Sequence, residues 1–210
     1  MKKIAVCLVG LLICFGSLVA QAQNIYMKVT PYAGASPTDN ISPGGRPLTV
    51  DGKLIDLSNY LQVSSVQYDF EQTLNIGSQS TGAGAGKIAF HPLTITKTAD
   101  QLSPPLFAAM ASGTPYQFIE FLFVSAPTTS RPVVLYKVLL KLAAVKTMSV
   151  SSVACPSGCP GIAESVSFEY GGYVVFTYTQ KPDGAIVPGK VAGWNRVKNI
   201  SDTSPTTPIN

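Results

Sequence analysis

The stretch LTITKTADQLSPPLFAAMASG, residues 93–113, contains the signals of a strand, a turn and one short helix. Residues 93–98 alternate large apolar side chains with polar β-branched ones, which is the period of a half-buried strand. Residues 99–102 turn the chain. No other part of the chain that follows the N-terminal leader has comparable helix signals, so the sequence predicts a mainly β protein with a single helix.

The helix has predicted start and stop residues. Ser103 is expected to cap the free N–H groups of the first turn, and Pro104 to occupy the first helical position, where its missing donor costs nothing. Gly113 is expected to end the helix in a left-handed conformation. One face of the helix carries an apolar stripe that we expect to pack on the sheet, formed by Leu106, Phe107 and Met110.

Residues 1–22 are predicted to be an export signal that is removed. Two lysines precede an apolar run over residues 4–19, and Ala20-Gln-Ala22 is a typical cleavage signal. The apolar run is too short and too poorly followed for a membrane span, so we expect no stable membrane insertion after processing. Neither Cys7 nor Cys14 follows the small residue that a lipoprotein site needs.

The remaining chain, about 190 residues, is predicted to form one domain over residues 23–200, followed by a disordered tail over residues 201–210. Loss of Lys2 and Lys3 lowers the formal charge from +4 to about +2, which is not the balance of a nucleic-acid-binding protein. Charged residues make up only 12% of the chain. This composition favours either a self-associating protein or an ordinary exported β-domain rich in Thr, Ser and Gly.

Two cysteines follow the leader, Cys155 and Cys159. In an exported protein this spacing predicts a disulfide that closes a small loop, with a redox-active pair as the alternative. A zinc site would need two more nitrogen or sulfur ligands, and the chain has a single histidine, His91. We therefore expect neither a metal nor a cofactor.

Strand signals recur along the chain with turns between them. Gly171-Gly172 separates two alternating runs and predicts a hairpin there, and Pro182-Asp-Gly184 predicts a tight turn. Together these signals predict a small barrel or two packed sheets with the helix at its side. The predicted strands cover residues 25–30, 60–70, 88–98, 117–125, 133–147, 164–170 and 173–179.

Two stretches lack strand periodicity. Pro31 to Lys53 is rich in Pro and Gly, and a compact domain is expected to use so long a loop. Gly77 to Lys87 is a polar Gly/Ala/Thr connection. It is not a phosphate-binding loop, because Thr81 replaces the required first glycine and Ile88 the required hydroxyl residue.

Catalytic motifs are lacking. The chain has one histidine and no G-x-S-x-G, and its acidic residues lie singly along the sequence, so nothing local pairs a nucleophile with a base. His91 is expected to be hydrogen-bonded or solvent-exposed at the head of a strand. Trp194 is expected to be a packing anchor near the end of the chain. We predict that the protein is not an enzyme.

The order of these elements resembles the haemolysin-coregulated protein (Hcp) family, the tube subunit of type VI secretion systems. Residues 25–29 resemble the opening strand of the family, and residues 77–87 fall where the family has its Gly/Ser/Thr loop. The other elements that carry the resemblance are the strand 93–98, Asp100, Ser103-Pro104, Ser151-Ser152, the strand 164–170, residues 176–178 and Gly193-Trp-Asn195.

The resemblance implies an Hcp-like β-barrel of two packed sheets, which assembles into hexameric rings that stack into a tube. It implies that the protein acts through the shape of the tube, whose lumen can hold secreted effectors. It also implies that other type VI components are partners. It also implies that the loop 31–53 lies at contacts between subunits or rings. The candidate contact residues in this loop are Ser36, Asp39 and Arg46.

The export signal departs from the family pattern, because typical tube subunits are assembled in the cytoplasm. The sequence therefore predicts either an exported Hcp-like ring protein, periplasmic or secreted, or cytoplasmic assembly if the signal is not used. A further alternative is an exported monomeric β-domain that binds a ligand or a surface protein.

Overall fold

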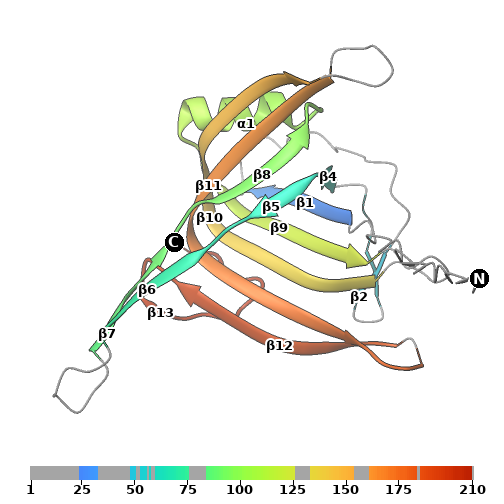
Figure 1. The fold of residues 1–210 in the computed structure, drawn as a ribbon, viewed down its shortest axis with the longest axis vertical. Coiled ribbons are helices and arrows are strands. Elements are labelled where there is room, and N and C mark those ends of the chain that lie inside the picture. The colour runs from blue at the N-terminus through green and yellow to red at the C-terminus, as the bar shows by residue number, and fades with distance from the viewer. Residues whose placement is uncertain are drawn as a thin grey trace, which may run out of the picture.

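Over the residues that the structure describes, the protein is mainly β with one short α-helix at its side, as predicted (Figure 1). The computed structural model describes residues 24–32, 48–50, 53–55, 57, 60–75, 84–125, 133–153, 161–183 and 185–209. The elements are β1 (Asn24–Pro31), β2 (Leu48–Val50), β3 (Lys53–Ile55), β4 (Leu61–Val63), β5 (Ser65–Gln67), β6 (Phe70–Asn75), β7 (Gly84–Phe90), β8 (Leu93–Thr98), α1 (Ser103–Ser112), β9 (Tyr116–Ser125), β10 (Val133–Val153), β11 (Gly161–Gln180), β12 (Ile186–Asn195) and β13 (Ile200–Ser201).

The larger of the two sheets closes on itself as a barrel. β1, β9, β10, β11 and β8 follow one another as antiparallel neighbours. β4 pairs with β1, and β5 pairs with β8. Ser64 alone separates β4 from β5, and its N–H donates to the carbonyl oxygen of Thr96 at 2.8 Å. β4 and β5 therefore act as one bent strand that joins the two ends of the sheet.

Alternation along the strands fills the barrel with apolar side chains. On β8, for example, Leu93 and Ile95 are fully buried, while the side chains between them lie at the surface of the sheet. The other fully buried members of this core include Met27, Leu106, Ile119, Phe121, Val138, Leu140, Val166 and Phe168.

The predicted hairpin at Gly171-Gly172 is wrong. β11 runs through both glycines as one strand, and neither glycine has a positive φ. They are needed for space instead: a Cβ on Gly171 would lie 3.1 Å from a methyl carbon of Leu142. The hairpin partner of β11 is β10, along almost its whole length.

At these glycines β11 changes its neighbour. Its first half pairs with β8, ending at Phe168, and its second half pairs with β12, starting at Gly172. The chain before β8 leaves the barrel as the arm β6–β7, which is the second sheet, and β12 diverges from it (Figure 1). The first four residues of β7, 84–87, belong to the predicted loop 77–87, so the strand begins earlier than the predicted residue 88. Opposite Gly171, Leu142 interrupts the pairing with a φ of +49°, a costly conformation for a bulky side chain.

The helix begins at Ser103, but the predicted cap is wrong. No side chain caps the helix, and the Ser103 hydroxyl instead donates to Glu164 at 2.7 Å. Gly113 ends the helix as predicted, with a φ of +69°. Leu106 is fully buried and Met110 packs against the core, whereas Phe107 is 59% exposed and contradicts the predicted stripe.

Residues 202–209 contact the barrel, although their composition predicts a disordered tail. Asp202 forms an ion pair with Lys141, and Ile209 is only 2% exposed. Composition alone suggested a solvated segment, but two specific contacts offset the entropy of ordering it.

Three predictions lie outside the described residues. These are the export signal over residues 1–22, the pairing of Cys155 with Cys159, and the contact residues Ser36, Asp39 and Arg46. Of the helices in the described ranges, none has the length and apolar character needed to cross a membrane.

Replacement of Tyr116 by phenylalanine is expected to raise the free energy of unfolding by about 1 kcal/mol. Tyr116 is 4% exposed, and its hydroxyl has no hydrogen-bond partner in the described part of the chain. Burial accordingly raises the pKa of Tyr116 to about 12. Urea denaturation measures the effect.

The matched control is Tyr170→Phe. The Tyr170 hydroxyl donates to the carbonyl oxygen of His91 at 3.0 Å, so this variant is expected to lose about 1 kcal/mol. A loss for Tyr116→Phe as large as that for Tyr170→Phe would contradict the prediction.

Candidate functional site: two apolar surfaces

The fold brings one set of chemically active side chains together beneath α1. The Lys97 Nζ lies 2.7 Å from both Asp100 Oδ1 and Glu164 Oε2, and 2.9 Å from the Ser103 hydroxyl. The Lys97 side chain is fully buried and that of Glu164 is 4% exposed.

This buried cluster is structural in its geometry. A lysine that acts as a base must be neutral, whereas Lys97 donates to two carboxylates as an ammonium. The Ser103 hydroxyl is likewise held by Glu164, and burial keeps substrate away. The cluster joins α1 to β8 and β11. It could not be predicted from the sequence, because Glu164 is distant from Lys97 along the chain.

A groove lies where β7 and β12 diverge, and we call it the fork groove. It consists of two adjoining cavities of about 660 and 690 Å³. Ile88, Phe90, Trp194 and Asn199 line both of them. Trp194, the predicted packing anchor, is half-buried in this wall, and its Nε1–H donates to Asn199 at 3.3 Å.

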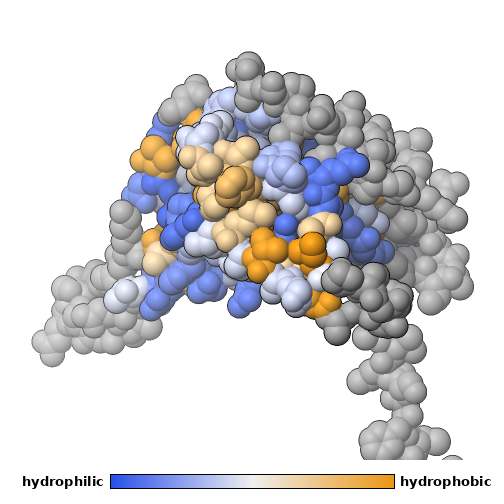
Figure 2. Space-filling view, turned by 90° about the horizontal axis from the view of Figure 1, so that it is seen from above, coloured by the Kyte–Doolittle hydropathy of each residue, from blue (hydrophilic) through white to orange (hydrophobic). Residues whose placement is uncertain are grey.

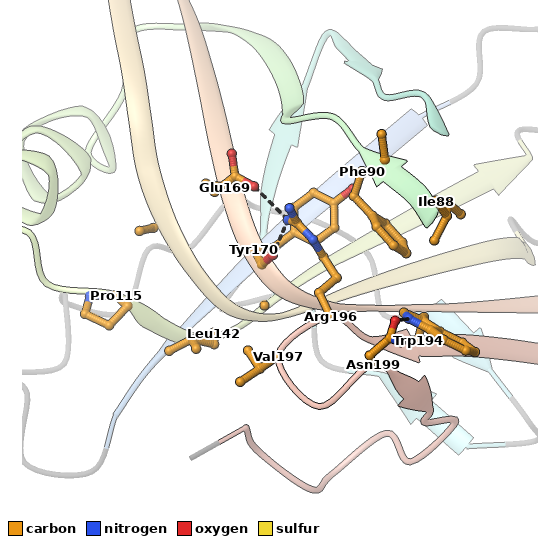
Figure 3. A pocket seen from close by; sticks show the side chains of 13 residues that line it. Ile88, Phe90, Pro115, Leu142, Glu169, Tyr170, Trp194, Arg196, Val197 and Asn199 are labelled. Atoms are coloured by element: carbon orange, nitrogen blue, oxygen red, sulfur yellow. Dashed lines mark hydrogen bonds and ion pairs between the residues drawn. The ribbon is translucent and has the colours of Figure 1, made fainter. Parts of the chain in front are cut away.

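Arg196 lies at one end of the fork groove, where several interactions hold its side chain in place (Figure 3). Its guanidinium lies over the rings of Phe90 and Tyr170, at 5.2 and 5.0 Å from their centres. It also donates to Glu169 at 2.7 Å, and Lys146 donates to the same carboxylate. Burial tends to raise the pKa of Glu169, but the hydrogen bonds and charges of Arg196 and Lys146 together lower it below its usual value. The charges at this end are therefore neutralised in place.

Aromatic rings form the other end of the fork groove. Phe70 packs edge-on against Phe90 and Tyr173, with ring centres 5.3 and 4.9 Å apart. Below them the hydroxyls of Tyr68 and Tyr136 lie 3.1 Å apart. Rings held in this way make a rigid apolar wall.

A second apolar surface lies at the opposite end of the barrel, and we call it the apolar cap. It combines Phe107 of α1 with Val150 and Ile162, which share one face of the β10–β11 hairpin near its tip. Their exposed fractions are 59%, 60% and 46%. A band of apolar colour runs across this end of the molecule (Figure 2). Clustered exposed apolar side chains of this kind mark contact surfaces.

The predicted site residues fall into separate places. Ser103 belongs to the buried cluster, Leu106 to the core and Phe107 to the apolar cap. His91 lies at the root of the arm, with its side chain 43% exposed and its Nδ1 4.0 Å from Asp69. The sequence shows no local signal for the fork groove, because its walls come from five strands, β6, β7, β10, β11 and β12, which are spread along the chain.

The comparisons with known proteins agree on one family. The family model described as "Type VI secretion system effector, Hcp" matches residues 50–178. No curated protein matches the chain.

Solved structures share the fold. A type six secretion system protein matches with 18% identity and a TM-score of 0.66, over 86% of this chain and 100% of that one. Hcp1 from Salmonella typhimurium matches with 18% identity and a TM-score of 0.55, over 86% and 99%. A further Hcp protein matches with 14% identity and a TM-score of 0.55, over 80% and 99%.

Proposed function

The chain belongs to the Hcp family, the tube-protein family of type VI secretion, and on this premise we propose that its copies join into a hexameric ring. Rings of this kind can stack into a hollow tube. The family is structural, so the proposed action depends on shape and on a lumen that carries secreted effectors, and it needs neither a cofactor nor a reactive side chain.

The observation that carries the proposal is the pair of apolar surfaces at opposite ends of a closed barrel. The apolar cap is exposed and the fork groove is concave, and their side chains are largely uncharged or neutralised in place. Two different surfaces that fit each other make a head-to-tail contact, which closes into a ring when the rotation between copies permits. The low share of charged residues, 12%, suits such contacts.

The solution mass tests this proposal. Light scattering of the processed chain is expected to give six times the mass of one chain, and negative-stain images to show rings. The variant Val150→Lys places a charge in the apolar cap and is expected to weaken assembly at least tenfold, because an unpaired charge is costly to bury.

Val191→Lys is the matched control. Val191 is 43% exposed on β12 and lies outside both apolar surfaces, so the same substitution there is expected to leave the mass unchanged. A wild-type chain that remains single at high concentration would rule out the ring.

Members of the family are secreted type VI components, and we propose that this one is exported through residues 1–22. Cell fractionation and N-terminal sequencing are expected to find a chain that starts at Gln23 outside the cytoplasm. A cytoplasmic chain that starts at Met1 would instead support assembly in the cytoplasm. The pairing of Cys155 with Cys159 remains a prediction that belongs with export.

The segment 31–53, which contains the strand β2, remains the proposed contact between subunits or rings. Deletion of residues 36–46, which include Ser36, Asp39 and Arg46, is expected to impair ring or tube formation. Unchanged assembly of this deletion variant would remove the loop from the mechanism.

The second candidate function is that of an exported monomeric β-domain that binds a ligand. The aromatic lining and the volume of the fork groove favour it, because small-molecule sites are concave and mostly apolar. A solution mass of one chain, with a ligand bound in the fork groove, would support this candidate over the ring.

A further inference from the structure

The last part of the chain, residues 202–209, lies in a recess on the outer wall of the barrel, and we call this segment the strap. The walls of the recess come from β10, β11 and β12. The Asp202 N–H donates to the carbonyl oxygen of Gly193 at 3.1 Å, and the Tyr32 hydroxyl donates to that of Ile209 at 3.2 Å. The strap is therefore held near both of its ends.

A buried cation holds the first residue of the strap. Lys141 follows the core residue Leu140 on β10, and its side chain is fully buried although it faces the outer wall. Its Nζ donates to Asp202 Oδ2 at 2.8 Å. Burial tends to raise the pKa of Asp202, but hydrogen bonds from Lys141 and Ser204 and the charges of Lys141 and Lys198 lower it. A buried ammonium needs such a carboxylate, so the recess is chemically selective.

Two glycines give the recess its shape. A Cβ on Gly172 would lie 2.7 Å from the Cδ1 of Ile209, and one on Gly193 would overlap the carbonyl oxygen of Asp202. Ile209 is 2% exposed as a result. The strands thus provide a preformed site for an extended segment with a carboxylate near one end and an aliphatic side chain near the other.

We propose that this recess also accepts the strap of a neighbouring copy, so that straps exchange between subunits. The inference rests on the proposed assembly, in which identical recesses lie close together and the local concentration of straps is high. Exchange of an identical segment needs no new type of contact, because each recess keeps the same carboxylate and the same isoleucine. The strap follows β13 directly, and β13 follows the turn over residues 196–199.

Charge reversal in two full-length variants tests the exchange. Lys141→Glu faces the native Asp202, and Asp202→Lys faces the native Lys141, so each variant alone is expected to expel its strap and lose hydrogen-exchange protection over residues 202–209. In an equimolar mixture, the native strap of the first variant fits the native recess of the second, and the two altered partners form the reversed pair. Protection is therefore expected to recover to at least half of the wild-type level.

Several outcomes would overturn the proposal. In one, protection in the mixture equals the average of the two separate variants. In another, either variant alone keeps wild-type protection, since the ion pair then does not hold the strap. The wild-type mass distinguishes failure of this proposal from failure of the proposed ring. A six-fold mass without recovery of protection would support the ring and contradict exchange. Recovery of protection with a smaller mass would support exchange and contradict the hexameric ring.

A peptide provides a second measurement in case the Lys141→Glu variant does not fold. A synthetic peptide of residues 201–210 is added to the full-length Asp202→Lys variant, whose recess is native and vacated. The peptide is expected to bind at least ten times more tightly than a control peptide that carries Asp202→Asn. Equal binding of the two peptides, or no binding of either, would contradict a site that accepts the segment in trans.

Discussion

Replacement of Lys97 by methionine is expected to lower the free energy of unfolding by about 3 to 5 kcal/mol. Methionine keeps most of the side-chain volume but leaves the carboxylate of Glu164, which is 4% exposed, without its cation. The loss is the cost of an unpaired buried charge rather than of lost packing. Urea denaturation of the variant and of the wild type measures it.

Two controls isolate the cause. The second substitution Glu164→Gln, added to Lys97→Met, is expected to recover much of the loss, because it removes the unpaired charge. Lys146→Met removes a cation that is 50% exposed beside Glu169, and is expected to cost under about 1 kcal/mol. If the three variants were equally unstable, burial would not be the cause.

The second large effect on stability is expected from truncation of one of two neighbouring residues of α1. Leu106→Ala is expected to cost about 2 to 5 kcal/mol, because Leu106 is fully buried in the core and its truncation leaves a cavity. Phe107→Ala, on a side chain that is 59% exposed, is expected to change stability by at most about 0.5 kcal/mol. Denaturation at a concentration where each variant is a single chain makes the comparison.

The same pair of variants is expected to behave in the opposite way in assembly. Phe107→Ala removes the aromatic ring from the apolar cap and is expected to reduce the population of rings, which light scattering detects. An unchanged ring population with a large loss of stability for Phe107→Ala would contradict the placement of Phe107 at the surface.

Local signals in the sequence were sufficient for strands such as β8 and for the end of the helix. Alternation over residues 93–98 predicted β8, and Gly113 ends α1 as its position indicated. The start of the helix could not be predicted, because the Ser103 hydroxyl has a better partner in Glu164 than in the free N–H groups of its own helix. That partner lies on β11, which is distant in sequence.

The other wrong predictions concern residues whose role depends on neighbours that are distant in sequence. Gly171-Gly172 has the composition of a turn, yet it lies within one strand, where it leaves space for Leu142 and Ile209. The tail has the composition of a disordered segment, but Lys141 supplies a buried charge that Asp202 must meet. The fork groove arises where β11 exchanges one partner for another, which no single stretch of sequence records.

The bent strand β4–β5 has a mechanical consequence. It completes the circumference through only three residue pairs with β1 and three with β8, whereas β10 and β11 share a seam of nearly their full length. A subunit that is pushed along with its neighbours transmits load through its hydrogen-bonded seams, and the shortest seam yields first. Under force, the wall of each subunit is therefore expected to tear beside Ser64.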